Sequence, residues 1–169
     1  MADFNGPYEA MILAEGGYRL TSVKNDRGGQ TYAGIARTKN PHWPGWAYID
    51  NGDTPPANLV RDFYRSEVWD RIRGDDLAST DIAGMVFDFA VNAGVSVAVK
   101  LAQIVAGVTP DGKAGPKTVA ALDAVDPGVF RTNYTLAKIA RYVEIVGKDR
   151  TQERFLLGWC RRSLAGLKG

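Results

Sequence analysis

The sequence predicts a mainly α-helical bundle that carries one loop-rich insert and at most a short β-hairpin. Apolar residues recur at helical spacing along most of the 169 residues. Only the stretch 19–52 breaks this pattern, because it is rich in Gly, Asn, Asp and Pro. A chain with 45% hydrophobic residues can bury a core without a metal, another cofactor or a disulfide, and its one cysteine, Cys160, excludes an internal disulfide.

The first helix is expected to end at Glu15. Apolar residues at helical spacing lead up to this position, and Gly16 and Gly17 then stop the helix. In the insert that follows, only residues 30–35 have the pattern of a short strand. Loop-rich inserts on a helical scaffold often carry functional residues, so this is the first region to search for a site.

The remaining helices are expected to follow one another with short connections. Ser79 or Thr80 is the expected N-cap of a helix that runs to about Ala93 and is apolar on nearly all sides, so it should be central in the fold. A boundary just before it divides the chain into residues 1–78 and 79–169, which we expect to pack as one compact body. The other helices are expected over 55–70 with Thr54 as the N-cap, from Ser96 to Gly107, after Pro116, and over about 127–147 and 151–165.

The net charge of +2 hides an uneven distribution of charged residues. Residues 1–60 sum to −1, residues 61–90 to −3 and residues 91–169 to +6. The basic segment indicates either a solvated helix surface or a polyanionic partner. Nucleic acid is not the expected partner, because the basic residues are spread out and no nucleic-acid module signature accompanies them. No apolar run approaches the roughly 20 residues that span a bilayer, so no membrane insertion is expected.

Glu15 is the strongest candidate for chemistry. A carboxyl group at the C-terminal end of an apolar helix meets the negative end of the helix dipole, which favours the protonated form that a general acid needs. The two glycines after it would let a bulky substrate approach the carboxyl group. Taken alone, the same residue is also compatible with an ordinary surface glutamate before a glycine cap.

Two residues of the insert are candidates to complete a site with Glu15. Asp26 lies in a glycine-rich turn, and Thr31 lies in the short strand that follows. An acid, a water-activating carboxylate and a hydroxyl that holds the water together meet the requirements of inverting glycoside hydrolysis. By itself, Asp26 is also a common kind of turn residue.

Several parts of the sequence resemble one known enzyme family. Glu15-Gly16-Gly17-Tyr18, followed by Asp26-x-Gly28-Gly29-x-Thr31-x-x-Gly34-Ile35, resembles the N-terminal signature of the glycoside hydrolase 108 lysozymes, which are N-acetylmuramidases. The segments 64–70, 87–94 and 111–118 resemble the joining helix and the peptidoglycan-binding-like region that accompany this catalytic part. The resemblance runs from about residue 8 to 160 and implies a lysozyme-like fold. It also implies that Glu15 is the catalytic acid, with Asp26 and Thr31 in matching positions, in an order similar to that of phage T4-type lysozymes.

Five other residues are candidates for substrate binding. Tyr18 and Tyr32 flank the expected catalytic set, and Trp46 belongs to an aromatic loop that could stack on sugar faces. The alternative for these aromatic residues is packing against the body of the protein. Asp88 and Asn92 lie four residues apart on the expected central helix, where they could bind an acetamido group or hydrogen-bond the 19–52 loop.

The resemblance implies a peptidoglycan hydrolase that cleaves the β-1,4 bond between N-acetylmuramic acid and N-acetylglucosamine. A lytic transglycosylase that uses Glu15 alone, or a non-catalytic wall-binding module, are the alternatives. The expected partner is the glycan strand of peptidoglycan, and the chain is expected to be a monomer. Because no secretory signal is apparent, we expect synthesis in the cytoplasm and access to the wall through a holin, as for an endolysin, or through a secretion system.

Overall fold

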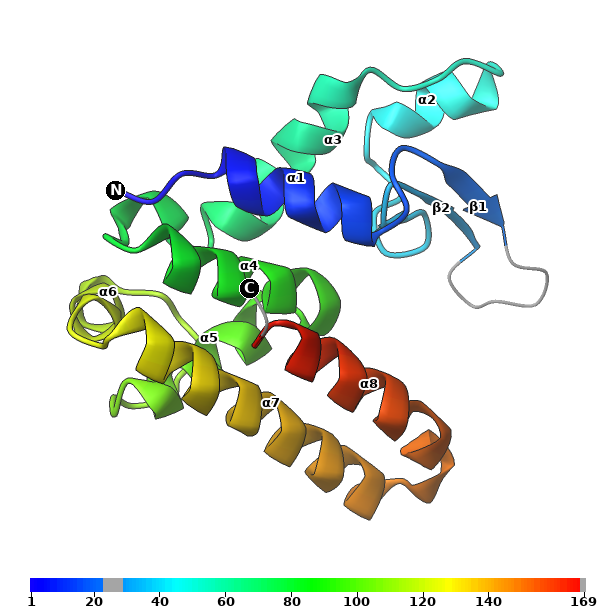
Figure 1. The fold of residues 1–169 in the computed structure, drawn as a ribbon. Coiled ribbons are helices and arrows are strands. Elements are labelled where there is room, and N and C mark those ends of the chain that lie inside the picture. Colours follow the sequence, from blue (N-terminus) through cyan, green and yellow to red (C-terminus); the bar gives the residue numbers. More distant parts are fainter. Residues whose placement is uncertain (23–28, 168–169) are drawn as a thin grey trace.

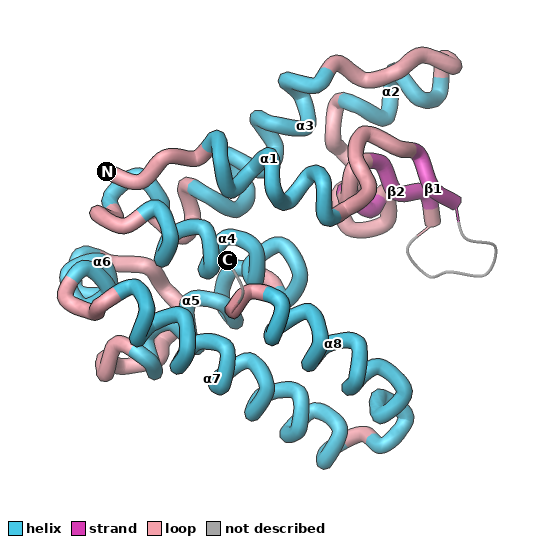
Figure 2. Tube along the Cα trace, viewed as in Figure 1, coloured by secondary structure: helices cyan, strands magenta, loops and turns pink. Residues whose placement is uncertain are grey.

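The computed structural model describes residues 1–22 and 29–167 and shows the mainly α, lysozyme-like fold that the sequence predicts. Helices make up most of the described chain, and the strands are confined to one end of the molecule (Figure 2). None of the described helices is both long enough and apolar enough to cross a membrane.

The sheet has three short antiparallel strands, where the sequence predicts a short hairpin at most. In spatial order, the strands are β1 (Leu20–Ser22), β2 (Gln30–Tyr32) and β3 (Ile35–Ala36). The strand expected over 30–35 is interrupted by a two-residue turn at Ala33 and Gly34, which both have positive φ. β1 was not predicted, because three residues are too few to reveal an alternating pattern.

The helices of the N-terminal part lie beside this sheet (Figure 1). They are α1 (Asn5–Ala14), α2 (Gly45–Asp50) and α3 (Ala57–Tyr64), followed by a π-helical turn (Arg65–Trp69) and a 3-10 turn (Gly74–Asp76). The short helix α2 was not predicted, because it lies inside the Gly- and Pro-rich insert. The prediction of Thr54 as an N-cap is wrong: Pro56 precedes the first turn of α3, and no side chain caps it.

The C-terminal part of the described chain consists of helices joined by short connections. They are α5 (Val95–Val105), α6 (Pro116–Asp123), α7 (Pro127–Lys148) and α8 (Glu153–Ala165), with a 3-10 turn (Arg150–Gln152) between the last two. Pro116 and Pro127 occupy the first helical positions, where a missing amide proton costs nothing. α8 packs against α7, and Figure 1 shows the two side by side. The helices predicted in this part are confirmed to within a few residues.

The apolar helix α4 (Thr80–Ala93) is central, as predicted. Ser79 caps it by accepting a hydrogen bond from the helix backbone at 3.3 Å. α4 contacts α1, α5 and α7, and in Figure 1 it lies between α1 above and α7 below. On α4, Phe87 packs edge-on against Phe4 and Trp69, and all three rings are buried. This aromatic cluster joins α1, the turn after α3, and α4 into one core.

A buried glutamine fixes the loop between α5 and α6. Gln103 is 2% exposed, and its amide nitrogen donates to the Asp111 carboxylate at 2.8 Å and the Thr118 hydroxyl at 3.0 Å. Its amide oxygen accepts from the Gly112 amide at 2.8 Å. These partners belong to the segment 111–118, which resembles the peptidoglycan-binding-like region. In this protein their hydrogen bonds with Gln103 hold the loop onto α5.

Replacing Gln103 with Leu is expected to lower the free energy of unfolding by about 3 kcal/mol, because the buried amide of Gly112 and the hydroxyl of Thr118 lose their partner. Urea unfolding followed by circular dichroism measures the change. The control is Gln152→Leu in the turn before α8, which is expected to stay within about 0.5 kcal/mol of wild type because its hydrogen bonds are exposed to solvent. Equal losses in the two variants would contradict the role of Gln103.

Candidate active site

Glu15 lies at the C-terminal end of α1, where the two following glycines close the helix. Gly16 and Gly17 have φ of +87° and +80°, and the Gly17 amide donates to the Ile12 carbonyl at 2.8 Å. This closure fixes the position of the Glu15 side chain, which is 25% exposed. The carboxyl group is therefore accessible from solvent but backed by protein on most sides.

The turn between β2 and β3 lies directly against Glu15. Gly34 has φ of +81°, and a Cβ atom at this position would lie 3.4 Å from Cγ and 3.5 Å from Oε2 of Glu15. The same Cβ would overlap the hydroxyl of Tyr64. Only glycine combines this backbone conformation with so close an approach, so the turn is shaped around the carboxyl group.

Tyr64 of α3 holds this turn in place through a hydrogen bond. Its hydroxyl is buried and donates to the Ala33 carbonyl at 2.8 Å. Burial, followed by the negative charge of Glu15, raises the pKa of Tyr64. The residue is therefore a neutral hydrogen-bond donor at physiological pH, and α1, α3 and the sheet meet at Glu15.

The other carboxyl oxygen of Glu15 faces α8. Oε1 lies 3.6 Å from Nη2 of Arg162, and the Arg162 guanidinium also donates to the side-chain oxygen of Asn92 at the end of α4. The amide nitrogen of Asn92 donates to the Asp88 carbonyl at 2.8 Å. The last helix of the described chain thus contributes a cation to the neighbourhood of an acid on the first.

Residues that adjoin Glu15 line several depressions in the surface, of which two are small. One, of about 260 Å³, is lined in part by Gly34 and Tyr64, and the other, of about 240 Å³, is lined in part by Asn92 and Arg162. Since both depressions are built from neighbours of the same carboxyl group, an extended polymer could contact both while it passes Glu15.

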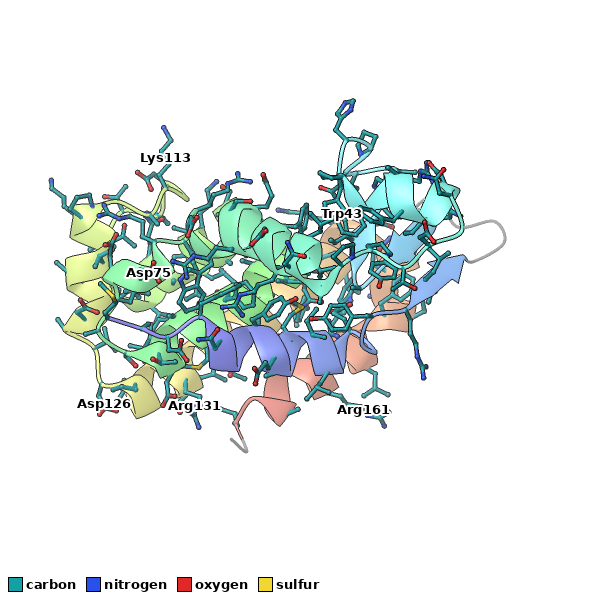
Figure 3. All side chains as sticks on the ribbon, turned by 90° about the horizontal axis from the view of Figure 1, so that it is seen from above. Trp43, Asp75, Lys113, Asp126, Arg131 and Arg161 are labelled. Atoms are coloured by element: carbon teal, nitrogen blue, oxygen red, sulfur yellow. The ribbon has the colours of Figure 1, made fainter. Side chains whose placement is uncertain are left out.

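The first depression continues into a larger one of about 460 Å³. Trp43 lines this larger part, and Figure 3 places it beside α2. The two depressions share Lys39, Asn40, Phe63 and Glu67. Two adjoining depressions, with both apolar and polar walls, therefore lie on the Gly34 side of Glu15.

Of the two residues expected to activate and position the water, the structure describes only Thr31. Thr31 lies on β2, and its carbonyl accepts a hydrogen bond from the Thr21 hydroxyl at 3.3 Å. In the part of the chain that the structure describes, no hydrogen bond joins the Thr31 hydroxyl to Glu15. Asp26 lies outside the described residues.

The aromatic candidates lie at different depths. Tyr18 is 42% exposed, and its hydroxyl lies 3.0 Å from that of Tyr8. Tyr32 is 3% exposed and stacks on Trp43 with ring centroids 5.9 Å apart. Burial raises the pKa of Tyr32, whose hydroxyl has no hydrogen-bond partner among the described residues.

Trp46 packs inside the protein and does not present a sugar-stacking face. It is 3% exposed, its indole N–H donates to the Asn40 carbonyl at 2.7 Å, and the Arg37 guanidinium covers its ring at 5.2 Å. Trp43 meets the same ring edge-on, with centroids 5.2 Å apart. Of the two roles that the sequence allowed, packing of the insert is the one that fits this environment.

Asp88 and Asn92 are both exposed on α4. Neither forms a hydrogen bond with the described part of the 19–52 loop, residues 19–22 and 29–52. Asn92 adjoins Glu15 through Arg162, whereas Asp88 lines a larger cavity of about 720 Å³ between α1, α4, α7 and α8, which Arg162 also lines. Both residues therefore line depressions that include Arg162, the neighbour of Glu15.

Three residues around Glu15 were not among the candidates from sequence, namely Gly34, Tyr64 and Arg162. Gly34 and Tyr64 belong to the motifs that carry the family resemblance, so the sequence did contain a signal that could have identified them. Arg162 stands on a helix with several arginines at the far end of the chain, and no spacing distinguishes it.

Comparisons with known proteins identify two matching families and a similar structure. A family model described as Glycosyl hydrolase 108 matches residues 8–94, and one described as Predicted Peptidoglycan domain matches residues 97–164. Among solved structures, the chain is similar to SagA of Brucella abortus, with a TM-score of 0.65 and 25% sequence identity. That similarity covers 98% of this chain and 96% of the other. No curated protein matches the chain.

The first family match includes Glu15, the turn at Gly34, Tyr64 and Asn92, whereas Arg162 belongs to the second. The two matches together cover nearly all of the chain, and the first alone covers more than half of it. The chain therefore belongs to the glycosyl hydrolase 108 family and is a glycoside hydrolase that acts on peptidoglycan.

Proposed function

We propose that the protein hydrolyses the β-1,4 bond between N-acetylmuramic acid and N-acetylglucosamine, with Glu15 as the general acid. The observation that carries this proposal is the placement of the Glu15 carboxyl group. It lies between the glycine turn at Gly34 and the guanidinium of Arg162, and neighbours of the same group line two depressions that suit a polymer. A partly exposed acid beside adjoining depressions is what cleavage inside a glycan strand requires.

In the proposed reaction, Glu15 donates its proton to the bridging oxygen as the bond from this oxygen to C1 of N-acetylmuramic acid breaks. A water molecule then adds to C1, and its proton passes to a base. Arg162, 3.6 Å from Oε1, offsets the negative charge that remains on Glu15 after the proton has left. We assign activation of the water to Asp26 and its positioning to Thr31, which makes the reaction an inverting one.

Digestion of purified peptidoglycan tests which bond is cut. The released fragments are reduced with borohydride and analysed by mass spectrometry. We expect reduced N-acetylmuramic acid at the new ends. Reduced N-acetylglucosamine would place the cleavage at the other glycosidic bond, and anhydro sugars would replace the hydrolase by a lytic transglycosylase.

The same digestion tests the water-handling residues separately. Asp26→Asn and Thr31→Val are each expected to slow the release of fragments, because the water loses its base or its hydroxyl partner. The binding of intact sacculi, measured by co-sedimentation, should not change. Full activity of the Asp26→Asn variant would remove Asp26 from the mechanism and leave Glu15 as the one carboxyl group that the reaction needs.

A further inference from the structure

The depression on the α8 side of Glu15 has a composition suited to a specific ligand. It has a volume of about 240 Å³ and is formed by the end of α4 together with α7 and α8. We call it the arginine pocket. Its lining residues are Asn92, Ala93, Arg141, Tyr142, Ile145, Trp159 and Arg162.

One wall of the arginine pocket is a stack of aromatic rings. Trp159 stacks on Tyr142 with centroids 5.0 Å apart and an interplanar angle of 26°, and Phe155 extends the stack at 5.8 Å. The Tyr142 hydroxyl is hydrogen-bonded to Ser163, which is buried.

The charged groups of the pocket are all of one sign. Arg141 and Arg162 both line it, and no acidic residue among those that the structure describes does. Within the described chain, Arg141 forms no salt bridge, whereas Arg162 contacts Glu15 and Asn92. A guanidinium without an ion pair at the edge of an aromatic pocket suits a carboxylate ligand, which it can bind through two parallel hydrogen bonds.

The arginine pocket is adjacent to the candidate acid. Nη2 of Arg162 lies 3.6 Å from Oε1 of Glu15, and the same guanidinium donates to Asn92 in the pocket wall. A sugar in the pocket would therefore lie next to the bond that Glu15 acts on. In peptidoglycan, the sugar that carries carboxylates is N-acetylmuramic acid, because its lactyl group bears the stem peptide.

We propose that the arginine pocket binds an N-acetylmuramic acid unit together with its stem peptide. The sugar ring packs against Trp159 and Tyr142, the acetamido group meets Asn92, and a peptide carboxylate pairs with Arg141. This inference rests on the proposed function for the presence of a glycan strand at Glu15. It adds that the part of the chain that matches the second family model forms a subsite of the active site and selects peptide-bearing strands.

The test measures binding without turnover. The Glu15→Gln protein is titrated by calorimetry with a soluble disaccharide of N-acetylglucosamine and N-acetylmuramic acid, whose lactyl group carries either a tetrapeptide or, in the peptide-free form, a neutral amide in place of the peptide. Adding Arg141→Gln is expected to weaken binding of the peptide-bearing disaccharide about tenfold and to change binding of the peptide-free one less than about twofold. The matched control adds Arg161→Gln, which removes the same charge from the exposed outer edge of α8 (Figure 3) and should leave both affinities unchanged.

Equal losses for the two ligands, equal losses in the Arg141 and Arg161 variants, or no measurable binding of the peptide-bearing disaccharide would each overturn the proposal. These binding results do not depend on whether Glu15 is the general acid. If the Glu15→Gln protein still cleaved peptidoglycan, the assignment of Glu15 would fail, whereas the affinity difference at Arg141 would remain measurable with a disaccharide that lacks the scissile bond.

Discussion

Replacing Glu15 with Gln is expected to lower kcat on peptidoglycan by about a thousandfold. The amide has the shape of the carboxyl group and fits beside Gly34, but it cannot supply a proton to the glycosidic oxygen. Binding of intact sacculi should persist, because the depressions on either side of the residue keep their walls. Release of soluble fragments measures the rate, and co-sedimentation measures the binding.

The matched control for this prediction is Glu9→Gln. Glu9 lies on the same helix and is exposed, so the substitution removes the same charge from α1 without touching the candidate site. Its activity and thermal midpoint should equal those of wild type. A Glu15→Gln protein that keeps more than about a tenth of wild-type kcat would show that another group supplies the proton.

Replacing Gly34 with Ala is expected to reduce both stability and activity. The new Cβ would overlap the Tyr64 hydroxyl and press on the Glu15 side chain, in a backbone conformation that L-residues rarely adopt. The strain and the disturbed hydrogen bond from Tyr64 to Ala33 should together lower the free energy of unfolding by about 3 kcal/mol. Displacement of the acid should lower kcat by about a hundredfold, as small misplacements of reacting groups do.

Gly52→Ala separates the two effects. Gly52 has φ of +84°, close to that of Gly34, but a Cβ there meets nothing within 4 Å. This variant should lose only about 1 kcal/mol, for the backbone conformation, and keep full activity. If Gly34→Ala and Gly52→Ala had the same unfolding free energy and the same kcat, the turn at Gly34 would not be shaping the site.

Most of the fold was predictable because its signals are local. The cap at Ser79, the prolines at the start of α6 and α7, and the glycines after Glu15 each mark a helix boundary within a few residues. β1 and α2 were missed because they are short and lie in an insert whose composition is typical of loops. Their positions depend on packing between distant segments, such as the stack of Tyr32 on Trp43.

The candidate site was predictable only in part, for the same reason. Glu15 is recognisable from its neighbours in sequence, whereas Arg162 reaches it through the packing of α8 near α4, which no periodicity encodes. The sequence left two roles open for Trp46, because composition reveals an aromatic loop but not which of its rings is buried. The structure relates the uneven charge to the candidate site, because the basic segment 91–169 supplies Arg141 and Arg162 to the pocket beside Glu15.

Digestion of peptidoglycan in water labelled with heavy oxygen tests the central claim most directly. Fragments are reduced at once to prevent exchange, and mass spectrometry locates the label. We predict one heavy oxygen atom at C1 of the terminal N-acetylmuramic acid with the wild-type protein, and about a thousandfold slower release of labelled fragments with Glu15→Gln. Unlabelled anhydro ends, or labelled ends released at the wild-type rate by Glu15→Gln, would contradict a hydrolysis that depends on Glu15.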